Sequence, residues 1–375
     1  MNRAAIRCSV ALLLTVAHAP IAAARPPIVD VHVHTSPEQY AFTDALLTAN
    51  GVSRFVNLSG GAPGDGLEEA LDAAKDYDGR VIVCANPEWE KLTSGGFGES
   101  QARMLEQAAA MGARCLKISK SLGLGVPTPE DETKLLTVDD PRLDPMWAAA
   151  GRLGLPVFIH TGDPAAFFEP MSPANERWDE LSVHPAWSFA EPQYPRLEAL
   201  MAARDRVVER HRGTTFIGVH FGCWPENLDY IDKALSVHPN LFVDIAARVP
   251  EIGRHSAEKL RAVFLRHQDR ILFGTDLGVG RSLMLGSTGR TKPTIADAFL
   301  FFADHFRFLE TNDRGIPHPT PIQGRWTVDA IGLPEDVLEK VYAGNALKLL
   351  WHEDGPQGKD RNAVMHGTSV VDFFP

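Results

Sequence analysis

The sequence predicts an α/β domain built as a (β/α)8 TIM barrel, with long loops after its fifth and eighth strands. Short runs rich in valine, isoleucine and phenylalanine alternate with longer helical patterns, which is typical of repeated βαβ units and a parallel sheet. Eight such runs occur, and eight parallel strands can close into a barrel. A chain of 375 residues with 44% hydrophobic content suits this fold, because barrel domains commonly reach about 250 residues or more.

The expected strands are distributed along the whole chain. They cover 28–33, 54–58, 81–85, 114–119, 156–160, 215–221, 241–246 and 271–274. Helical patterns cover 67–77, 99–111, 144–153 and 255–267, and an amphipathic helix is expected at 335–351. We therefore expect the barrel to span residues 25–352 and residues 353–375 to form an irregular extension.

Two long segments interrupt this alternation, at 163–195 and at 278–325. Each follows the C-terminal end of an expected strand, where barrel enzymes build their sites. We interpret both as walls of a substrate pocket. For any single stretch within them, a plain surface excursion is an equally good interpretation.

The first 24 residues have the pattern of a secretory signal. Arg3 and Arg7 precede an apolar stretch at 10–16, and Ala22–Ala24 offers a small-residue cleavage site. We expect export to the periplasm or the medium after cleavage near Ala24. No later apolar run approaches the ~20 residues of a spanning helix, so no membrane span is expected in the mature chain.

The remaining cysteines and the charge also limit the interpretation. Cys84, Cys115 and Cys223 are odd in number and lie in apolar segments, which favours buried thiols over a disulfide framework. A formal net charge of -11 without charge blocks disfavours nucleic acid and anionic membranes as partners. We expect a small-molecule substrate, and the sequence leaves open whether the chain forms a homo-oligomer.

Polar residues at the expected strand ends carry the chemistry. His32 and His34 are two apart on one strand, so both side chains point to the same face. A His-X-His pair alone is a weak signal, because a lone strand histidine is more often a packed core residue than a ligand. However, His160, His220 and Asp276 also end expected strands, so five side chains converge on one mouth of a closed barrel. Such nitrogen and oxygen ligands with an open position make a catalytic divalent-metal site.

This order of motifs resembles the amidohydrolase superfamily, and in particular its amidohydrolase-related (amidohydrolase 2) branch of metal-dependent hydrolases and decarboxylases. The likeness spans 28–350 and includes the segments Phe273–Asp276 and Val341–Ala346, the latter similar to the Gly-Asn-Ala segment before the family's last helix.

The resemblance implies a role for each polar residue at the mouth. Metal ligands would be His32, His34 and His160, with His220 as ligand or as polariser of the substrate, and Asp276 as ligand and general base. One or two divalent ions are expected, with zinc the first expectation for a histidine-rich set and manganese or iron as alternatives.

Three functions are compatible with this site. In the first, Asp276 deprotonates a metal-bound water that attacks an amide, ester or lactone carbonyl, and then passes the proton to the leaving group. The second is a non-oxidative decarboxylase that uses the same metal to anchor an acid. The third is a non-catalytic metal-binding barrel, which leaves the basic carboxylate of Asp276 unexplained.

Lys117 lies on the fourth expected strand, where an unpaired buried charge would be costly. By resemblance to binuclear relatives, it could be carboxylated and bridge two metal ions. It could equally bind a substrate carboxylate, or form an ion pair with Asp276.

Four further residues are candidates for contacts around the metal. Arg248 follows the seventh strand and could bind a carboxylate with two hydrogen bonds, although an ion pair on the rim is at least as good an interpretation. Trp187 and Trp224 are candidates for an aromatic pocket wall, and ordinary loop packing is their alternative. Asp163 is a candidate for orienting His160.

Overall fold

The computed structural model describes residues 25–353. The expected signal segment (1–24) and residues 354–375 of the expected extension lie outside the described residues.

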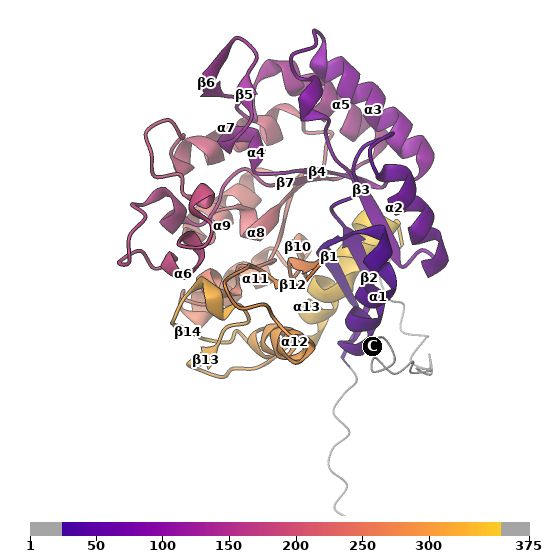
Figure 1. The fold of residues 1–375 in the computed structure, drawn as a ribbon. Coiled ribbons are helices and arrows are strands. Elements are labelled where there is room, and N and C mark those ends of the chain that lie inside the picture. The colour runs from indigo at the N-terminus through magenta and orange to yellow at the C-terminus, as the bar shows by residue number, and fades with distance from the viewer. Residues whose placement is uncertain (1–24, 354–375) are drawn as a thin grey trace, which may run out of the picture.

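Eight parallel strands form the centre of the molecule (Figure 1). In spatial order they are β1 (Ile28–Thr35), β2 (Val52–Asn57), β3 (Val81–Ala85), β4 (Cys115–Ile118), β7 (Val157–Ile159), β8 (Phe216–Gly218), β9 (Leu241–Asp244) and β10 (Ile271–Leu272). The residues that follow β10 return to β1, because the amide of Val31 donates to the carbonyl of Phe273 at 3.0 Å and that of Asp276 to the carbonyl of His32 at 2.9 Å. These bonds close the sheet into the predicted barrel.

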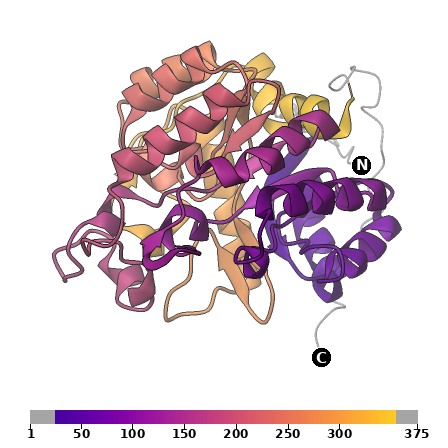
Figure 2. The same ribbon diagram turned by 90° about the horizontal axis from the view of Figure 1, so that it is seen from above.

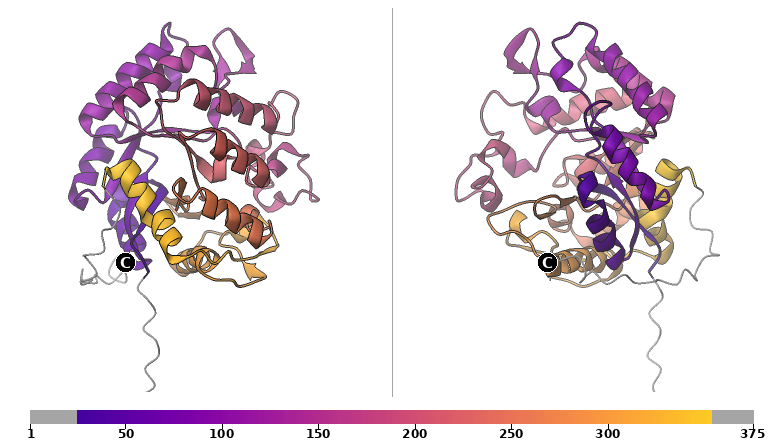
Figure 3. Two further views of the ribbon diagram at one scale, coloured as in Figure 1. Left: turned by 180° about the vertical axis from the view of Figure 1, so that it is seen from behind. Right: turned by 45° about the vertical axis from the view of Figure 1, so that its right-hand side comes forward.

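Helices surround the strands in every view (Figures 1 and 3). They are α1 (Tyr40–Ala49), α2 (Leu67–Ala74), α3 (Phe97–Met111), α5 (Asp144–Leu153), α7 (Leu197–Arg210), α9 (Leu228–Val237), α11 (Ala257–Arg266), α12 (Ile295–Glu310) and α13 (Glu335–Glu339). Helix α5 is a representative case, since it buries Met146 and Trp147 on one face and ends at Gly154 in the left-handed conformation, at φ 66°. An apolar stripe buried against the sheet and a glycine after the last turn are what stabilise such a helix.

The last described helix closes the barrel. Helix α13 continues into the π-helical turns η8 (Lys340–Gly344) and η9 (Leu347–Trp351). The amide of Phe273 donates to the carbonyl of Val341 at 2.9 Å, which fixes this helix beside the last barrel strand. Figure 2 shows it in yellow next to the indigo N-terminal elements, so both ends of the described chain stabilise one seam of the barrel.

The prediction of three buried thiols was wrong for two of them. Cys84 on β3 and Cys115 on β4 are register partners with Cα atoms 4.4 Å apart, and they form a disulfide. Cys223 is a free, buried thiol. The two bonded cysteines are 31 residues apart, and only the register of neighbouring strands brings them to bonding distance.

The two long insertions differ in their content. Residues 163–195 contain the short helices η5 (Ala165–Phe168), α6 (Trp178–Leu181) and η6 (Pro185–Trp187). Residues 278–325 begin within strand β11 (Leu277–Val279) and contain β12 (Leu283–Leu285) and the 16-residue helix α12. We did not predict α12, although Thr294 and Asp297 form a capping box at its start, which is a recognisable sequence signal.

The first insertion is attached to the barrel by a buried ion-pair network. The guanidinium of Arg177 contacts Glu180 within the insertion and Glu251 on α10 (Val249–Ile252), and Ser287 of the second insertion donates to Glu180. All three charged side chains are buried. Both insertions are therefore fixed to the rim of the barrel.

None of the helices described in residues 25–353 has the length and apolar character of a membrane-spanning segment.

Candidate metal centre

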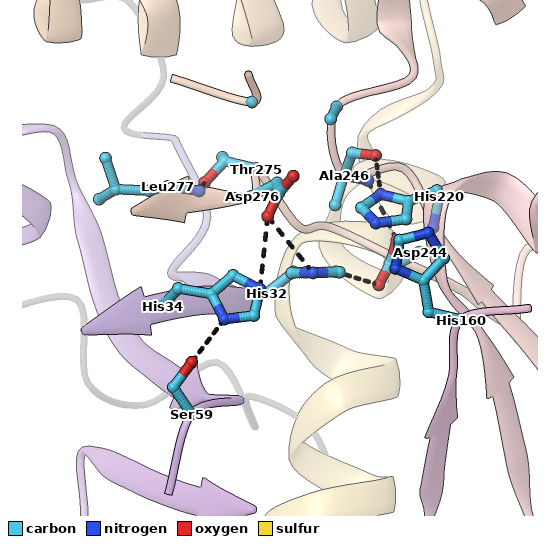
Figure 4. A network of polar contacts seen from close by, with 12 residues as sticks. His32, His34, Ser59, His160, His220, Asp244, Ala246, Thr275, Asp276 and Leu277 are labelled. Carbon is cyan, nitrogen blue, oxygen red and sulfur yellow. Dashed lines mark hydrogen bonds and ion pairs between the residues drawn. The ribbon is translucent and has the colours of Figure 1, made fainter. Parts of the chain in front are cut away.

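Three side chains at the C-terminal mouth of the barrel bring ligand atoms together. Atoms of His32, His220 and Asp276 lie within 4.8 Å of one another. The carboxylate of Asp276 is 3.5 Å from Nε2 of His32 and also 3.5 Å from Nε2 of His34, as Figure 4 shows. Four of the five predicted residues thus surround one point.

Unusual backbone conformations direct two of these side chains. His220 and Asp276 have positive φ angles of 56° and 63°. A residue other than glycine in this region is strained by about 1–3 kcal/mol and persists only where the surrounding structure holds it there. Gly274 permits the close approach of the strands, because a Cβ at this position would lie 3.0 Å from the Cβ of His32.

Asp244, at the end of β9, connects two of the histidines. Its Oδ2 accepts from Nδ1 of His32 at 2.9 Å, and its Oδ1 accepts from the backbone amide of His220 at 2.7 Å. Because the carboxylate fixes the proton of His32 on Nδ1, the lone pair of Nε2 faces the centre. That Nε2 atom is buried and has no hydrogen-bond partner among the described residues.

The other two rings around this point are held in the same way. Nδ1 of His220 lies 2.9 Å from the carbonyl of Ala246, and Nδ1 of His34 lies 2.7 Å from Oγ of Ser59. A carbonyl oxygen can only accept, so His220 donates from Nδ1 and keeps a lone pair on Nε2. The hydroxyl of Ser59 can accept from Nδ1 of His34 or donate to it, so the direct assignment of a metal-binding lone pair on Nε2 applies to His220.

His160 lies beside this group but has a different contact. Its ring centroid is 4.5 Å from that of His220, and its Nε2 is 3.3 Å from Asp163. Lys120 donates to the other oxygen of Asp163 at 2.6 Å. The structure thus brings Asp163 to His160, as the sequence suggested, and adds Lys120, which the sequence did not single out.

The two predicted wall tryptophans lie in different surroundings. The indole ring of Trp187 has its centre 4.8 Å from Nζ of Lys120, so it borders the site through that lysine. Trp224 packs with its ring centroid 5.1 Å from that of Tyr230. The contact of Trp224 with Tyr230 is of the kind expected from ordinary loop packing, which was the alternative to a role in the pocket wall.

Burial sets the protonation of the site. It lowers the pKa of His34 to about 3 and that of His160 to about 4, and it lowers the pKa of His32 well below the ordinary value. These rings are therefore neutral near pH 7. Burial raises the pKa of Asp276 to about 7, against the opposing effect of Lys117 and Arg248.

Lys117 and Arg248 both face this group of residues, and each is only 5% exposed. Burial lowers the pKa of Lys117 to about 8, while Asp244 and Asp276 act to raise it. Arg248 donates from Nη1 to the carbonyl of Ala247 at 2.9 Å. Its nearest ion-pair contact is from Nη2 to Asp163, at 3.9 Å.

A cavity of about 590 Å³ opens beside the cluster. Its lining includes His34, Ser59, Gly278 and Met284, so part of its wall comes from the β11–β12 pair at the start of the second insertion. The first strands of the insertion 278–325 thus line this cavity as expected, whereas no residue of the insertion 163–195 belongs to its lining.

These residues fit a divalent cation. Neutral imidazole nitrogens and a carboxylate oxygen are the ligands that zinc and related metals take in catalytic sites. The buried Nε2 of His32, which has no hydrogen-bond partner within residues 25–353, gives independent support, because a buried acceptor without a donor is normally satisfied by something bound.

Comparison with known proteins agrees with this geometry. A family model described as amidohydrolase matches residues 17–350. The chain belongs to the amidohydrolase family. The family match confirms the resemblance inferred from the residues at the strand ends. A separate comparison with curated proteins found no match.

Several solved structures are similar to this amidohydrolase at low sequence identity. An uncharacterized TIM-barrel protein from Bordetella bronchiseptica is 16% identical, with a TM-score of 0.51, over 87% of this chain and 98% of that one. A 2,6-dihydroxybenzoate decarboxylase from Rhizobium is 15% identical over 88% and 99% of the two chains, with a TM-score of 0.49. A 5-carboxyvanillate decarboxylase from Novosphingobium aromaticivorans, complexed with manganese, is 13% identical over 87% and 96%, with a TM-score of 0.49.

Sequence analysis did not single out Asp244, Ser59 or Lys120. Asp244 carried one usable signal, because an aspartate within the apolar run 241–246 must be buried and therefore needs hydrogen-bond donors. Ser59 and Lys120 lie in segments that follow strands, and nothing in their local sequence distinguishes them from ordinary polar residues.

Proposed function

We propose that this amidohydrolase is an exported, metal-dependent hydrolase of small carbonyl compounds, such as amides, esters or lactones. The observation that carries the proposal is the position of Asp276. Its carboxylate lies 3.5 Å from two histidines whose Nδ1 atoms are already bonded, and one of them, His34, lines an open cavity. A site for storage alone does not need a basic carboxylate in this position.

His32, His34, His220 and Asp276 would hold the ion, and His160, whose Nε2 contacts Asp163, is the remaining candidate ligand. Zinc is the metal that we propose first, because the ligands are mostly imidazoles. A bound divalent ion lowers the pKa of water to near neutrality and polarises a carbonyl. The Nδ1 contact of His220 with Ala246 supports the role of ligand, since a neutral ring bonded in this way has no Nε2 proton to donate to a substrate carbonyl.

The chain's own residues then move the proton. Asp276 accepts it from the attacking water and delivers it to the nitrogen or oxygen of the leaving group, which is general base and then general acid catalysis. Asp244 keeps His32 and His220 in position throughout this step.

A decarboxylase is the second candidate, and one specific observation favours it. Lys117 and Arg248 place two buried cationic groups near Asp276, where an acid could bind. In that reaction, the carbon–carboxylate bond breaks to release carbon dioxide, and the protonated carboxyl group of Asp276 delivers a proton to the carbon.

The test uses protein without residues 1–24, loaded with zinc or manganese, and measures metal content by elemental analysis. A panel of neutral lactones, esters and amides is assayed beside aromatic and aliphatic acids. Hydrolysis of neutral compounds supports the leading proposal, whereas release of carbon dioxide alone supports the decarboxylase. A protein that binds no divalent metal would exclude both.

Export is proposed from the N-terminal segment and has independent support from the Cys84–Cys115 disulfide. Disulfides persist mainly in oxidising compartments outside the cytosol. Cell fractionation of the full-length protein, with sequencing of its mature N-terminus, tests both export and cleavage near Ala24. A protein retained in the cytosol with an intact N-terminus would contradict the proposal.

A further inference from the structure

The junction between the first insertion (163–195) and the barrel contains more acidic than basic side chains. Arg177 contacts Glu180 and Glu251, and the carboxylate of Glu226 acts electrostatically on the same guanidinium. The side chains of Arg177, Glu180 and Glu251 are each at most 2% exposed. One guanidinium cannot neutralise three carboxylates, and an unpaired buried charge is costly. The junction therefore favours a state in which one of the three carboxyl groups carries a proton.

The hydrogen bonds identify Glu226 as that carboxyl group. Glu180 and Glu251 both accept from Arg177. Glu226 forms no ion pair and no hydrogen bond with another side chain within residues 25–353, and its Oε1 accepts from the backbone amide of Ala165 at 2.9 Å. Its other oxygen, Oε2, is buried and has no hydrogen-bond partner in this part of the chain. An ionised Glu226 would therefore be the least compensated of the three carboxylates.

Glu251 has an unpaired oxygen of the same kind. Its Oε2 is also buried without a hydrogen-bond partner among the described residues. A buried acceptor without a donor is costly, and a proton on Glu226 supplies a donor and removes the repulsion between the two carboxylates. Burial and the charge of Glu251 raise the pKa of Glu226 to about 7, against the opposing effect of Arg248.

The histidines around the junction do not compensate this charge. His255 and His318 each donate from Nε2 to a backbone carbonyl, at 2.8 and 3.1 Å. Burial lowers the pKa of His318 to about 4, so this ring is neutral near pH 7. Within residues 25–353, neither ring forms an ion pair with Glu226. Loss of the proton from Glu226 therefore leaves a buried negative charge at the junction.

The contacts of Glu226 and Glu251 hold the first insertion on the barrel. Ala165 begins η5 and Arg177 precedes α6, both within the insertion, whereas Glu226 follows α8 (Val219–Gly222) and Glu251 lies on α10. When Glu226 is ionised, it repels Glu251 at this junction, and both unpaired oxygens remain without a donor. The insertion should then separate more readily from the barrel.

We propose that Glu226 is a proton-dependent latch, which holds the first insertion closed when its carboxyl group is protonated and loosens it when the proton is lost to water. Trp187 in this insertion borders the metal centre through Lys120, so the latch would control access to the centre from that side. The inference concerns the position of the insertion and does not depend on which reaction the metal centre catalyses.

The direction of the pH effect follows from proton binding. The folded chain binds the proton of Glu226 more tightly than the unfolded chain does, because the pKa rises from 4.5 to about 7 on folding. The stabilising effect on the junction is therefore full below about pH 4.5 and is lost as the pH rises through about 7.

Hydrogen–deuterium exchange followed by mass spectrometry tests the latch on protein without residues 1–24. Exchange is measured at about pH 6 and about pH 8, with labelling times corrected for the intrinsic pH dependence of amide exchange. Zinc-loaded and metal-free samples are both measured, so that changes at the metal centre are separated from those at the junction. We expect the protection of amides in 163–195 to fall about tenfold between the two pH values in both samples, because Glu226 is mostly neutral at the first and mostly ionised at the second.

Substitutions assign this change to Glu226. Glu226→Gln keeps an oxygen that can accept from Ala165 but cannot ionise, so it should show the protection of the lower pH at both values. Glu169→Gln, at an exposed position of the same insertion, is the matched control and should lose protection as the wild type does. Glu251→Gln is the second variant if Glu226→Gln does not fold. An ionised Glu226 then faces no carboxylate at residue 251, and the pH-dependent loss of protection should become smaller.

Three results would overturn the proposal. The first is equal protection of 163–195 at both pH values in the wild type, and the second is an equal loss of protection in Glu226→Gln and the wild type. The third is a loss that extends over the barrel strands, because it would report unfolding of the whole domain. None of these measurements requires turnover, so their outcome is separate from that of the proposed function.

Discussion

Nδ1 of His32 lies 2.9 Å from Oδ2 of Asp244, between the first and seventh strands of the barrel. This contact determines which nitrogen of His32 faces the centre, because the carboxylate can only accept a proton. The same aspartate accepts from the amide of His220, where the backbone has a positive φ of 56°. Asp244 thus orients one proposed ligand through its ring and another through its main chain.

Asp244→Asn is expected to weaken metal binding about 10- to 100-fold, as is typical when the partner of a ligating histidine is changed. If the asparagine oxygen accepts from the amide of His220, its NH2 group faces His32. The ring must then accept at Nδ1 and carry its proton on Nε2, which blocks the ligand position. Metal competition with a chelator measures the change, and Asp269→Asn, at an exposed site, is the control. Wild-type affinity in Asp244→Asn would show that His32 is not oriented in this way.

Asp276→Asn should keep much of the bound metal and lose turnover by about 10²–10⁴-fold, the usual contribution of a general base. The amide can still offer an oxygen ligand but cannot accept a proton from water at neutral pH. Elemental analysis and steady-state kinetics on one preparation separate the two effects. Normal hydrolysis by this variant would contradict the assignment of Asp276 as the base.

The disulfide should stabilise the protein measurably. Replacing Cys84 and Cys115 by serine is expected to lower the free energy of unfolding by about 3–4 kcal/mol, because the bond closes a 31-residue loop in the unfolded chain. Urea denaturation measures this value. Unreduced protein without residues 1–24 should show one titratable thiol after unfolding, that of Cys223. Three thiols would contradict the bond.

Stability should fall in mild acid through His305, a residue on α12 away from the metal centre. Burial lowers its pKa from 6.5 to about 4, while Nδ1 remains bonded to the carbonyl of Phe301. The unfolded chain therefore binds a proton that the folded chain resists between pH 6.5 and 4. Stability is full above this window and falls as the pH decreases through it, by at most about 1.4 kcal/mol per pH unit for this group.

His305→Gln removes the titrating imidazole. The free energy of unfolding should therefore decrease less steeply between pH 6.5 and 4 than it does in the wild type. Urea denaturation of metal-free protein at several pH values gives both slopes, so that metal release does not contribute. Identical slopes for the variant and the wild type would show that His305 does not resist protonation in the folded state.

The barrel could be predicted because its signals are local. Eight runs of β-branched and aromatic residues alternate with helical patterns. The strand period of two residues and the helix period of 3.6 residues can both be recognised within a short stretch of sequence. The positions of His32, His34, His160, His220 and Asp276 at the ends of strands followed from the same patterns. In a parallel barrel, all such ends lie at one mouth, so the sequence also determined where these side chains would gather.

The register of the strands and the closure of the barrel decided which residues distant in sequence make contact. Register placed Cys84 opposite Cys115, and packing between the β4 loop and the first insertion brought Lys120 to Asp163. Asp244 became the partner of His32, 212 residues away, only because the barrel curves β9 and β1 toward one centre. These contacts join residues that are far apart in sequence, and local periodicity does not encode which distant residues meet.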